Sequence, residues 1–125
     1  MHWHLIACLS ALLLVGCRRP LDQQLVGEWL SGCSIDICII TALKPDHTFS
    51  QRFDQKDLAE PVLSGSWRIE GDQLVLRVTW EMQSKKISSV VGRDLRYAIS
   101  HVQPDSLVAT FLDAQEDSVH WKRRY

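Results

Sequence analysis

The sequence of 125 residues predicts an all-β fold, an antiparallel meander of about eight or nine short strands that closes into a small barrel. Three observations support this prediction. Apolar and polar residues alternate with a period of two, turn-forming residues recur at short intervals, and no segment shows helical periodicity. An apolar N-terminal segment precedes the predicted strands and has the layout of a signal peptide.

The clearest alternation lies between residues 73 and 82. One face of this segment carries only apolar residues, namely Leu74, Leu76, Val78, Trp80 and Met82. Ser66–Glu70 alternates in the same way, and Gly71 and Asp72 between the two segments are suited to a two-residue hairpin turn. The two segments therefore predict a β-hairpin with one buried face.

Turn-forming residues divide the rest of the chain into segments of strand length. The turns are expected at residues 44–47, 71–72, 92–94, 103–106 and 115–117. The predicted strands are 25–31, 37–43, 48–54, 62–70, 73–82, 86–91, 95–103, 107–113 and 118–124. Strands of this spacing, joined by tight turns, favour an antiparallel barrel or a strongly curled sandwich.

The N-terminal apolar segment is too short to span a membrane. From Leu5 to Val15 every residue except Ser10 is apolar, which makes eleven residues where a spanning helix needs about twenty. Such a segment, followed by a small residue and a cysteine, is typical of a secretory signal peptide. A buried N-terminal helix with a core cysteine is the alternative.

The sequence Leu14-Val15-Gly16-Cys17 resembles the lipobox of bacterial lipoproteins, with an ordinary secretory signal peptide as the alternative. The resemblance implies a diacylglyceryl group on Cys17, cleavage before it, and acylation, for example with palmitate, of the new amino terminus. Residues 1–16 are then the signal peptide, residues 17–24 a lipid-anchored tether, and residues 25–125 the barrel domain. Because Arg18 rather than aspartate follows Cys17, the sorting rule for such lipoproteins implies anchoring in the outer membrane, facing the periplasm.

Composition limits the kinds of partner. The residues after the signal peptide suffice for one domain with a modest core. The formal net charge is −1 at pH 7, with acidic and basic residues interspersed. We therefore expect no nucleic-acid partner. The expected contact with the membrane is through the lipid on Cys17, where Arg18 and Arg19 would lie at the headgroup layer.

Two tryptophans follow a glycine at the same spacing, in Leu25-Val26-Gly27-Glu28-Trp29 and in Leu63-Ser64-Gly65-Ser66-Trp67. A glycine two residues before a tryptophan lets the strand bend at a barrel end while the indole fills that end. This is similar to the G-x-W motif of lipocalins and calycins. With residues 43–49 and 65–74, the chain resembles small bacterial lipocalin-like domains, although His47 stands at the usual turn glycine.

The resemblance implies a barrel that binds a small apolar ligand without catalysis. It also implies an arginine packed over the first tryptophan, a place that Arg123 or Arg124 would take over Trp29. The candidate ligand-binding residues of the barrel interior are Trp29, Phe49, Trp67, Trp80, Phe111 and Trp121. The barrel is short, so these side chains could instead fill it. The alternative function is then a protein-interaction module, with an envelope protein as partner, or a hydrolase inhibitor.

Cys33 and Cys38 lie between the first two predicted strands, and an exported protein meets an oxidising compartment. Across a hairpin loop their spacing permits a disulfide. A zinc half-site and a redox pair are the alternatives.

No pattern indicates an enzyme. His47, His101 and His120 show no metal-binding spacing, and Ser64-Gly65-Ser66 lacks the context of a nucleophile elbow. We therefore predict no catalytic residue, no metal and no cofactor.

Overall fold

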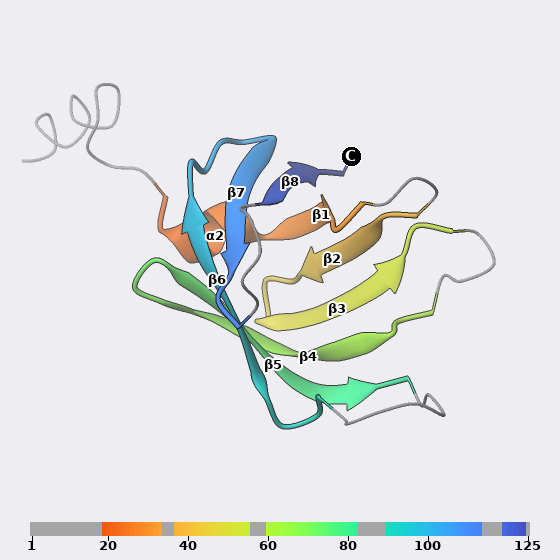
Figure 1. The fold of residues 1–125 in the computed structure, drawn as a ribbon. Coiled ribbons are helices and arrows are strands. Elements are labelled where there is room, and N and C mark those ends of the chain that lie inside the picture. The colour runs from red at the N-terminus through yellow and green to blue at the C-terminus, as the bar shows by residue number, and fades with distance from the viewer. Residues whose placement is uncertain (1–18, 34–36, 56–59, 83–89, 114–118, 125) are drawn as a thin grey trace, which may run out of the picture.

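Eight antiparallel strands form a closed barrel in the part of the chain that the structure describes (Figure 1). The structure is a computed structural model and describes residues 19–33, 37–55, 60–82, 90–113 and 119–124. The strands are β1 Gly27–Ser31, β2 Ile39–Leu43, β3 Thr48–Phe53, β4 Leu63–Glu70, β5 Gln73–Glu81, β6 Asp94–Ser100, β7 Ser106–Phe111 and β8 Val119–Arg123. Each strand pairs with the next, and β8 pairs with β1 to close the barrel.

The predicted all-β meander is confirmed. The hairpin of β4 and β5 turns at Gly71 and Asp72, with Glu70 paired to Gln73 and Gly71 at a φ of 61°. The predicted strand at residues 86–91 is not found in the described part, where Val90 and Val91 lead into a turn. Its residues 86–89 lie outside the described residues.

A short helix, α2 (Leu21–Leu25), occupies positions where the sequence predicted a tether. The carbonyl of Pro20 accepts hydrogen bonds from the N–H groups of Gln23 and Gln24 and so starts the helix. Leu21 and Leu25, four residues apart, share one helix face. Leu25 is fully buried and Leu21 packs against the core. One helical turn is too short for sequence periodicity to indicate it.

The two ends of the barrel differ. α2 lies at the end where β1 begins, which we call the helix end (Figure 1). β1 finishes at the other end, before the loop that Cys33 and Cys38 close, and we call this the disulfide end. Large apolar side chains fill the helix end, among them Trp29, Phe49, Trp67, Leu74 and Leu76.

Trp80 corrects one expectation. The alternation of β5 predicted an inward face from Leu74 to Met82, and Leu74, Leu76 and Val78 are buried as expected. Trp80 is 47% exposed and Met82 is 43% exposed. β5 pairs with β6 over Gln73–Arg77, whereas Trp80 pairs with Ser64 of β4 beyond that ladder. The register of β4 and β5 shifts here, because Gly65 pairs with the inward-facing Val78 whereas the next residue, Ser64, pairs with Trp80. This bulge turns Trp80 to the outer face of the barrel.

Arginine side chains cover part of the outer surface. Val75 points away from the core, yet it is fully buried between its cross-strand neighbours Arg68 and Arg96. Arg68 bonds the Asp94 carboxylate at 3.1 Å. Burial raises the pKa of Asp94, but the Arg68 hydrogen bond and the charges of Arg77 and Arg96 outweigh it and hold the pKa below its ordinary value. The aliphatic stems of Arg68 and Arg96 thus shield Val75 from water.

The predicted signal peptide, Cys17 and Arg18 lie outside the described residues. Within the part of the chain that is described, no helix is long and apolar enough to cross a membrane.

Candidate functional site

A cavity of about 180 Å³ lies at the disulfide end of the barrel and is open to solvent there. Side chains from β1, β2, β3, β6, β7 and β8 surround it. The lining residues are Ser31, Gly32, Ile39, Gln51, Tyr97, Ala109, Phe111 and Trp121. The barrel therefore has a filled half and a hollow half.

One wall of the cavity is aromatic. The ring of Tyr97 lies 5.1 Å from the ring of Phe111 and 5.3 Å from that of Trp121, centroid to centroid. The Tyr97–Trp121 pair meets edge to face, an arrangement that aromatic quadrupoles favour. Tyr97 and Phe111 are cross-strand partners in β6 and β7, so the ladder itself positions this wall.

The opposite wall is polar and uncharged. The hydroxyls of Ser31 and Thr41 lie 3.1 Å apart, and the Gln51 amide donates to the Thr41 hydroxyl at 3.1 Å. All three side chains are buried. Burial raises the pKa of the Tyr97 phenol, which a hydrogen bond with Gln51 partly opposes. Tyr97 is thus neutral at physiological pH, and the lining carries no charged side chain.

The raised pKa of Tyr97 predicts a loss of stability in alkali. An unfolded tyrosine loses its proton near pH 10, whereas the buried phenol holds its proton to a higher pH. Its contribution is therefore complete below about pH 10 and is lost as the pH rises through the folded pKa. Tyr97→Phe should flatten this part of a denaturation profile measured from pH 8 to 12. An unchanged profile would contradict the burial of the phenol.

The filled half is built around Trp29, which is fully buried. Its indole N–H donates to the Leu25 carbonyl at 2.8 Å, and the Arg123 guanidinium lies 4.2 Å from its ring centroid. The expected arginine over the first tryptophan is therefore Arg123. Gly27 lies beside this pair, and a Cβ there would collide with the Arg123 guanidinium. The first G-x-W glycine thus makes room for the arginine.

Trp67, the tryptophan of the second G-x-W motif, is held by different contacts from those of Trp29. The Trp67 indole donates to the Lys44 carbonyl at 3.0 Å, and the His47 ring stacks on it at 4.5 Å. His47 has a φ of 65°, the conformation that the usual turn glycine adopts easily. Stacking on Trp67, with a 3.2 Å contact from its ring nitrogen Nδ1 to the Trp67 carbonyl, holds the histidine there.

The six predicted ligand-binding residues are divided by the structure. Phe111 and Trp121 line the cavity, whereas Trp29, Phe49 and Trp67 are buried in the filled half. Trp80 is exposed, as described above. Sequence reasoning missed Tyr97 and Gln51, although each stands in a predicted strand. Alternation with Leu95 and Ile99 could have placed Tyr97 inside.

Cys33 and Cys38 form the predicted disulfide at this end of the barrel. Cys33 follows Gly32, which lines the cavity, so the disulfide restrains the backbone at the edge of the cavity. Residues 34–36 of the loop lie outside the described residues.

The bridge should stabilise the fold. In the chain-entropy model, closing so short a loop contributes about 2 kcal/mol. The double variant Cys33→Ser, Cys38→Ser should lose about that much unfolding free energy in a denaturant titration. A thiol count on the purified protein without reductant should find neither cysteine free. Two reactive thiols from this pair would contradict the bridge and favour the metal or redox alternatives.

Among the described residues, no three histidine, cysteine or acidic side chains gather as metal ligands would. His47, His101 and His120 stand on separate elements. Ser64 and Ser66 stand in the β4 ladder, paired with Ser50 and Thr48 of β3. The cavity at the disulfide end is therefore the candidate binding site for an uncharged ligand.

A comparison with protein-family models finds no match to this chain, and a comparison with curated proteins finds none either.

Proposed function

We propose that this protein is a lipid-anchored, lipocalin-like binding protein that holds one small apolar ligand in the cavity at the disulfide end. The observation that carries the proposal is the hollow half of the barrel, with Tyr97, Phe111 and Trp121 on one side and Gln51 on the other. Buried apolar walls with a few placed polar groups are the usual composition of ligand sites.

The cavity volume limits the ligand. Drug-sized ligands occupy pockets of about 300–1,000 Å³, and this cavity holds about 180 Å³. An apolar protein cavity of about 150 Å³ accommodates benzene. The ligand is therefore a single ring or a short chain, without charge, because burying an unpaired charge against these walls would be costly.

The polar wall gives the ligand an orientation. Gln51 and the Tyr97 phenol can exchange hydrogen bonds with a hydroxyl or amide, while the ring stacks on the aromatic wall. A phenol-like molecule fits better than benzene, since it satisfies polar groups that are otherwise paired only with one another.

The test is a titration of the purified protein with benzene and phenol, followed by the midpoint of thermal unfolding. A ligand that binds the folded state raises this midpoint in a saturable way. Phenol should raise it at lower concentration than benzene. Ala109→Leu should abolish the response, because it fills the cavity from β7, whereas Ala98→Leu on β6, outside the cavity lining, should preserve it.

If Ala109→Leu does not fold, a second variant tests the same cavity. Phe111→Ala enlarges the cavity and should admit a two-ring probe such as naphthalene that the natural protein excludes. Equal responses of the natural protein and of Ala109→Leu would contradict ligand binding in the cavity. Absence of any response to either probe would favour the protein-interaction module.

The alternative function, a protein-interaction module, is supported by a different part of the structure. Trp80 and Met82 are exposed near the disulfide end of the barrel. Large exposed apolar side chains mark contact surfaces on many proteins. Trp80→Ala would then weaken capture of an envelope protein or hydrolase without changing the cavity.

The anchor rests on the sequence Leu14-Val15-Gly16-Cys17. Cys17→Ser should abolish lipid labelling and leave unprocessed or soluble protein. Normal membrane fractionation and labelling of this variant would contradict the lipoprotein assignment.

A further inference from the structure

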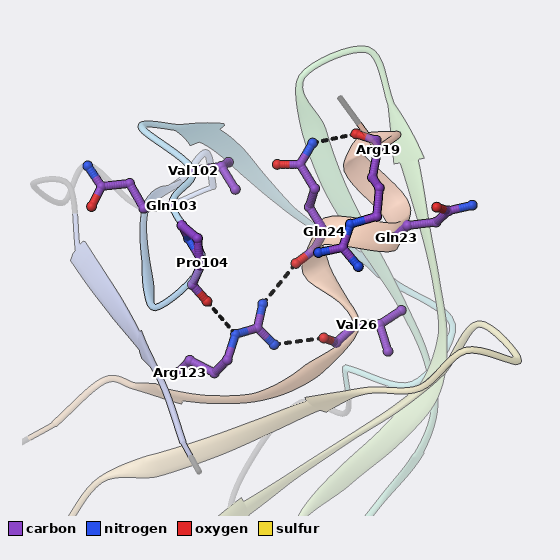
Figure 2. A pocket seen from close by; sticks show the side chains of 8 residues that line it. All are labelled: Arg19, Gln23, Gln24, Val26, Val102, Gln103, Pro104 and Arg123. Atoms are coloured by element: carbon purple, nitrogen blue, oxygen red, sulfur yellow. Dashed lines mark hydrogen bonds between the residues drawn. The ribbon is translucent and has the colours of Figure 1, made fainter. Parts of the chain in front are cut away.

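A second hollow lies at the helix end, outside the filled half of the barrel. It is an open groove of about 620 Å³ between α2 and the loop that joins β6 to β7 (Figure 2). Two arginines, Arg19 and Arg123, take part in its lining, together with Gln23, Gln24 and Gln103. This volume lies within the range of ligand sites.

Arg123 is held in one orientation. Its Nε donates to the Pro104 carbonyl at 2.6 Å, its Nη1 to the Val26 carbonyl at 2.8 Å, and its Nη2 to the Gln24 carbonyl at 2.9 Å (Figure 2). The guanidinium also lies over the Trp29 ring. A guanidinium has five N–H donors, so two remain for a further acceptor. Because the group is already ordered, binding to it costs little conformational entropy.

The positive charge of the groove has no carboxylate partner among the described residues. Neither Arg19 nor Arg123 lies within 4.0 Å of an acidic side chain there, and no acidic residue lines the groove. Asp22 of α2 instead accepts from the Gln23 N–H and lies 3.9 Å from His47. By contrast, five arginines elsewhere on the barrel pair with carboxylates: Arg52, Arg68, Arg77, Arg96 and Arg124.

We infer that this groove binds a phosphate group, and that an anionic phospholipid headgroup supplies it. Guanidinium groups match phosphate oxygens with paired N–H donors. The two guanidinium groups come from different parts of the chain, with Arg19 just before α2 and Arg123 on β8. The Gln24 amide donates to the Arg19 carbonyl, and the Gln103 side chain points away from both arginines (Figure 2). A neutral ligand would leave both cations uncompensated.

The position of Arg19 close to Cys17 favours a phospholipid as the source of the phosphate group. This step rests on the proposed lipid anchor. Arg19 follows Cys17 by two residues, and a chain spans at most about 3.6 Å per residue. The Cα atom of Arg19 therefore lies within about 7 Å of that of Cys17. If Cys17 carries the lipid, the groove is held at the depth of the headgroup phosphates. Binding there would orient the barrel with its helix end on the membrane and its cavity toward the periplasm.

The first experiment uses inorganic phosphate as the probe. The purified lipidated protein, in a neutral detergent, is titrated with phosphate and, at equal ionic strength, with chloride. Phosphate should raise the unfolding midpoint where chloride does not. Arg19→Gln should weaken the apparent phosphate affinity about tenfold, as expected for loss of one charge-assisted hydrogen bond. Arg93→Gln, an exposed arginine before β6 at the disulfide end, should leave it unchanged.

The second experiment separates the two sources of phosphate. Short-chain phosphatidylglycerol and phosphatidylcholine, both below their micelle concentrations, replace inorganic phosphate. Tighter binding of phosphatidylglycerol than of phosphate, lost in Arg19→Gln, supports the headgroup. Binding of phosphate alone would replace the lipid with a soluble phosphate compound. No response to either probe, or equal responses in the natural protein and Arg19→Gln, would overturn the site.

These outcomes are independent of the cavity proposal. Arg19 does not line the cavity, and the benzene and phenol titration does not involve the groove. Absence of lipid on Cys17 would remove only the membrane source, since inorganic phosphate binding needs no anchor.

Discussion

Trp29→Ala should lower the free energy of unfolding by about 3–5 kcal/mol, the range for removal of a large core aromatic. Trp29 is fully buried at the helix end. The change leaves a cavity there, removes the N–H donor to the Leu25 carbonyl, and leaves the Arg123 guanidinium without the ring beneath it. Urea unfolding followed by circular dichroism would measure the loss.

Trp80→Ala is the matched control. Trp80 is about half exposed, so its removal should cost less than about 1 kcal/mol. Similar losses for the two variants would mean that Trp29 does not close the barrel end. A loss below about 1 kcal/mol for Trp29→Ala would contradict its burial.

Gly65→Ala should destabilise the protein by about 3 kcal/mol, at the upper part of the range for overpacking. A Cβ at Gly65 would collide with the backbone carbonyl of Arg77 on β5. Backbone atoms cannot rotate away as a flexible side chain can, and the register between β4 and β5 shifts at Ser64 and Gly65. The added methyl group must therefore separate the two strands at the bulge.

Gly92→Ala separates this steric effect from that of backbone conformation. Gly92 has a φ of 86°, and no atom lies within 4 Å of a Cβ placed there. Its replacement should cost about 1 kcal/mol through backbone strain alone. Thermal or urea unfolding of both variants provides the comparison. Equal losses would indicate that the bulge relaxes to accept a side chain at position 65.

The two proposed binding sites lie at opposite ends of the barrel. The helix end is filled with aromatic side chains and carries a fixed arginine at its surface, next to α2. The disulfide end is hollow and uncharged. Because a filled core supplies stability at one end, the other end can leave apolar surface unpaired for a ligand at a modest cost.

The sequence by itself determined the local features of this protein. Period-two alternation and turn residues place the strands, and Gly71 and Asp72 specify the hairpin of β4 and β5. Five positions separate Cys33 from Cys38, so their disulfide is also a local property. These features depend on neighbours along the chain, and such neighbours are visible in a sequence.

Only the tertiary structure decided what meets across the barrel. Arg123 reaches Trp29 because β8 closes onto β1, and the motif alone left Arg124 equally open. Tyr97, Gln51 and Trp121 meet at one cavity from three strands that no short pattern connects. Trp80 stands two residues after the buried Val78 and is nevertheless exposed, because the bulge between β4 and β5 places it on the outer face. The cavity likewise depends on the volumes left between distant side chains, and those volumes exist only once the sheet has closed.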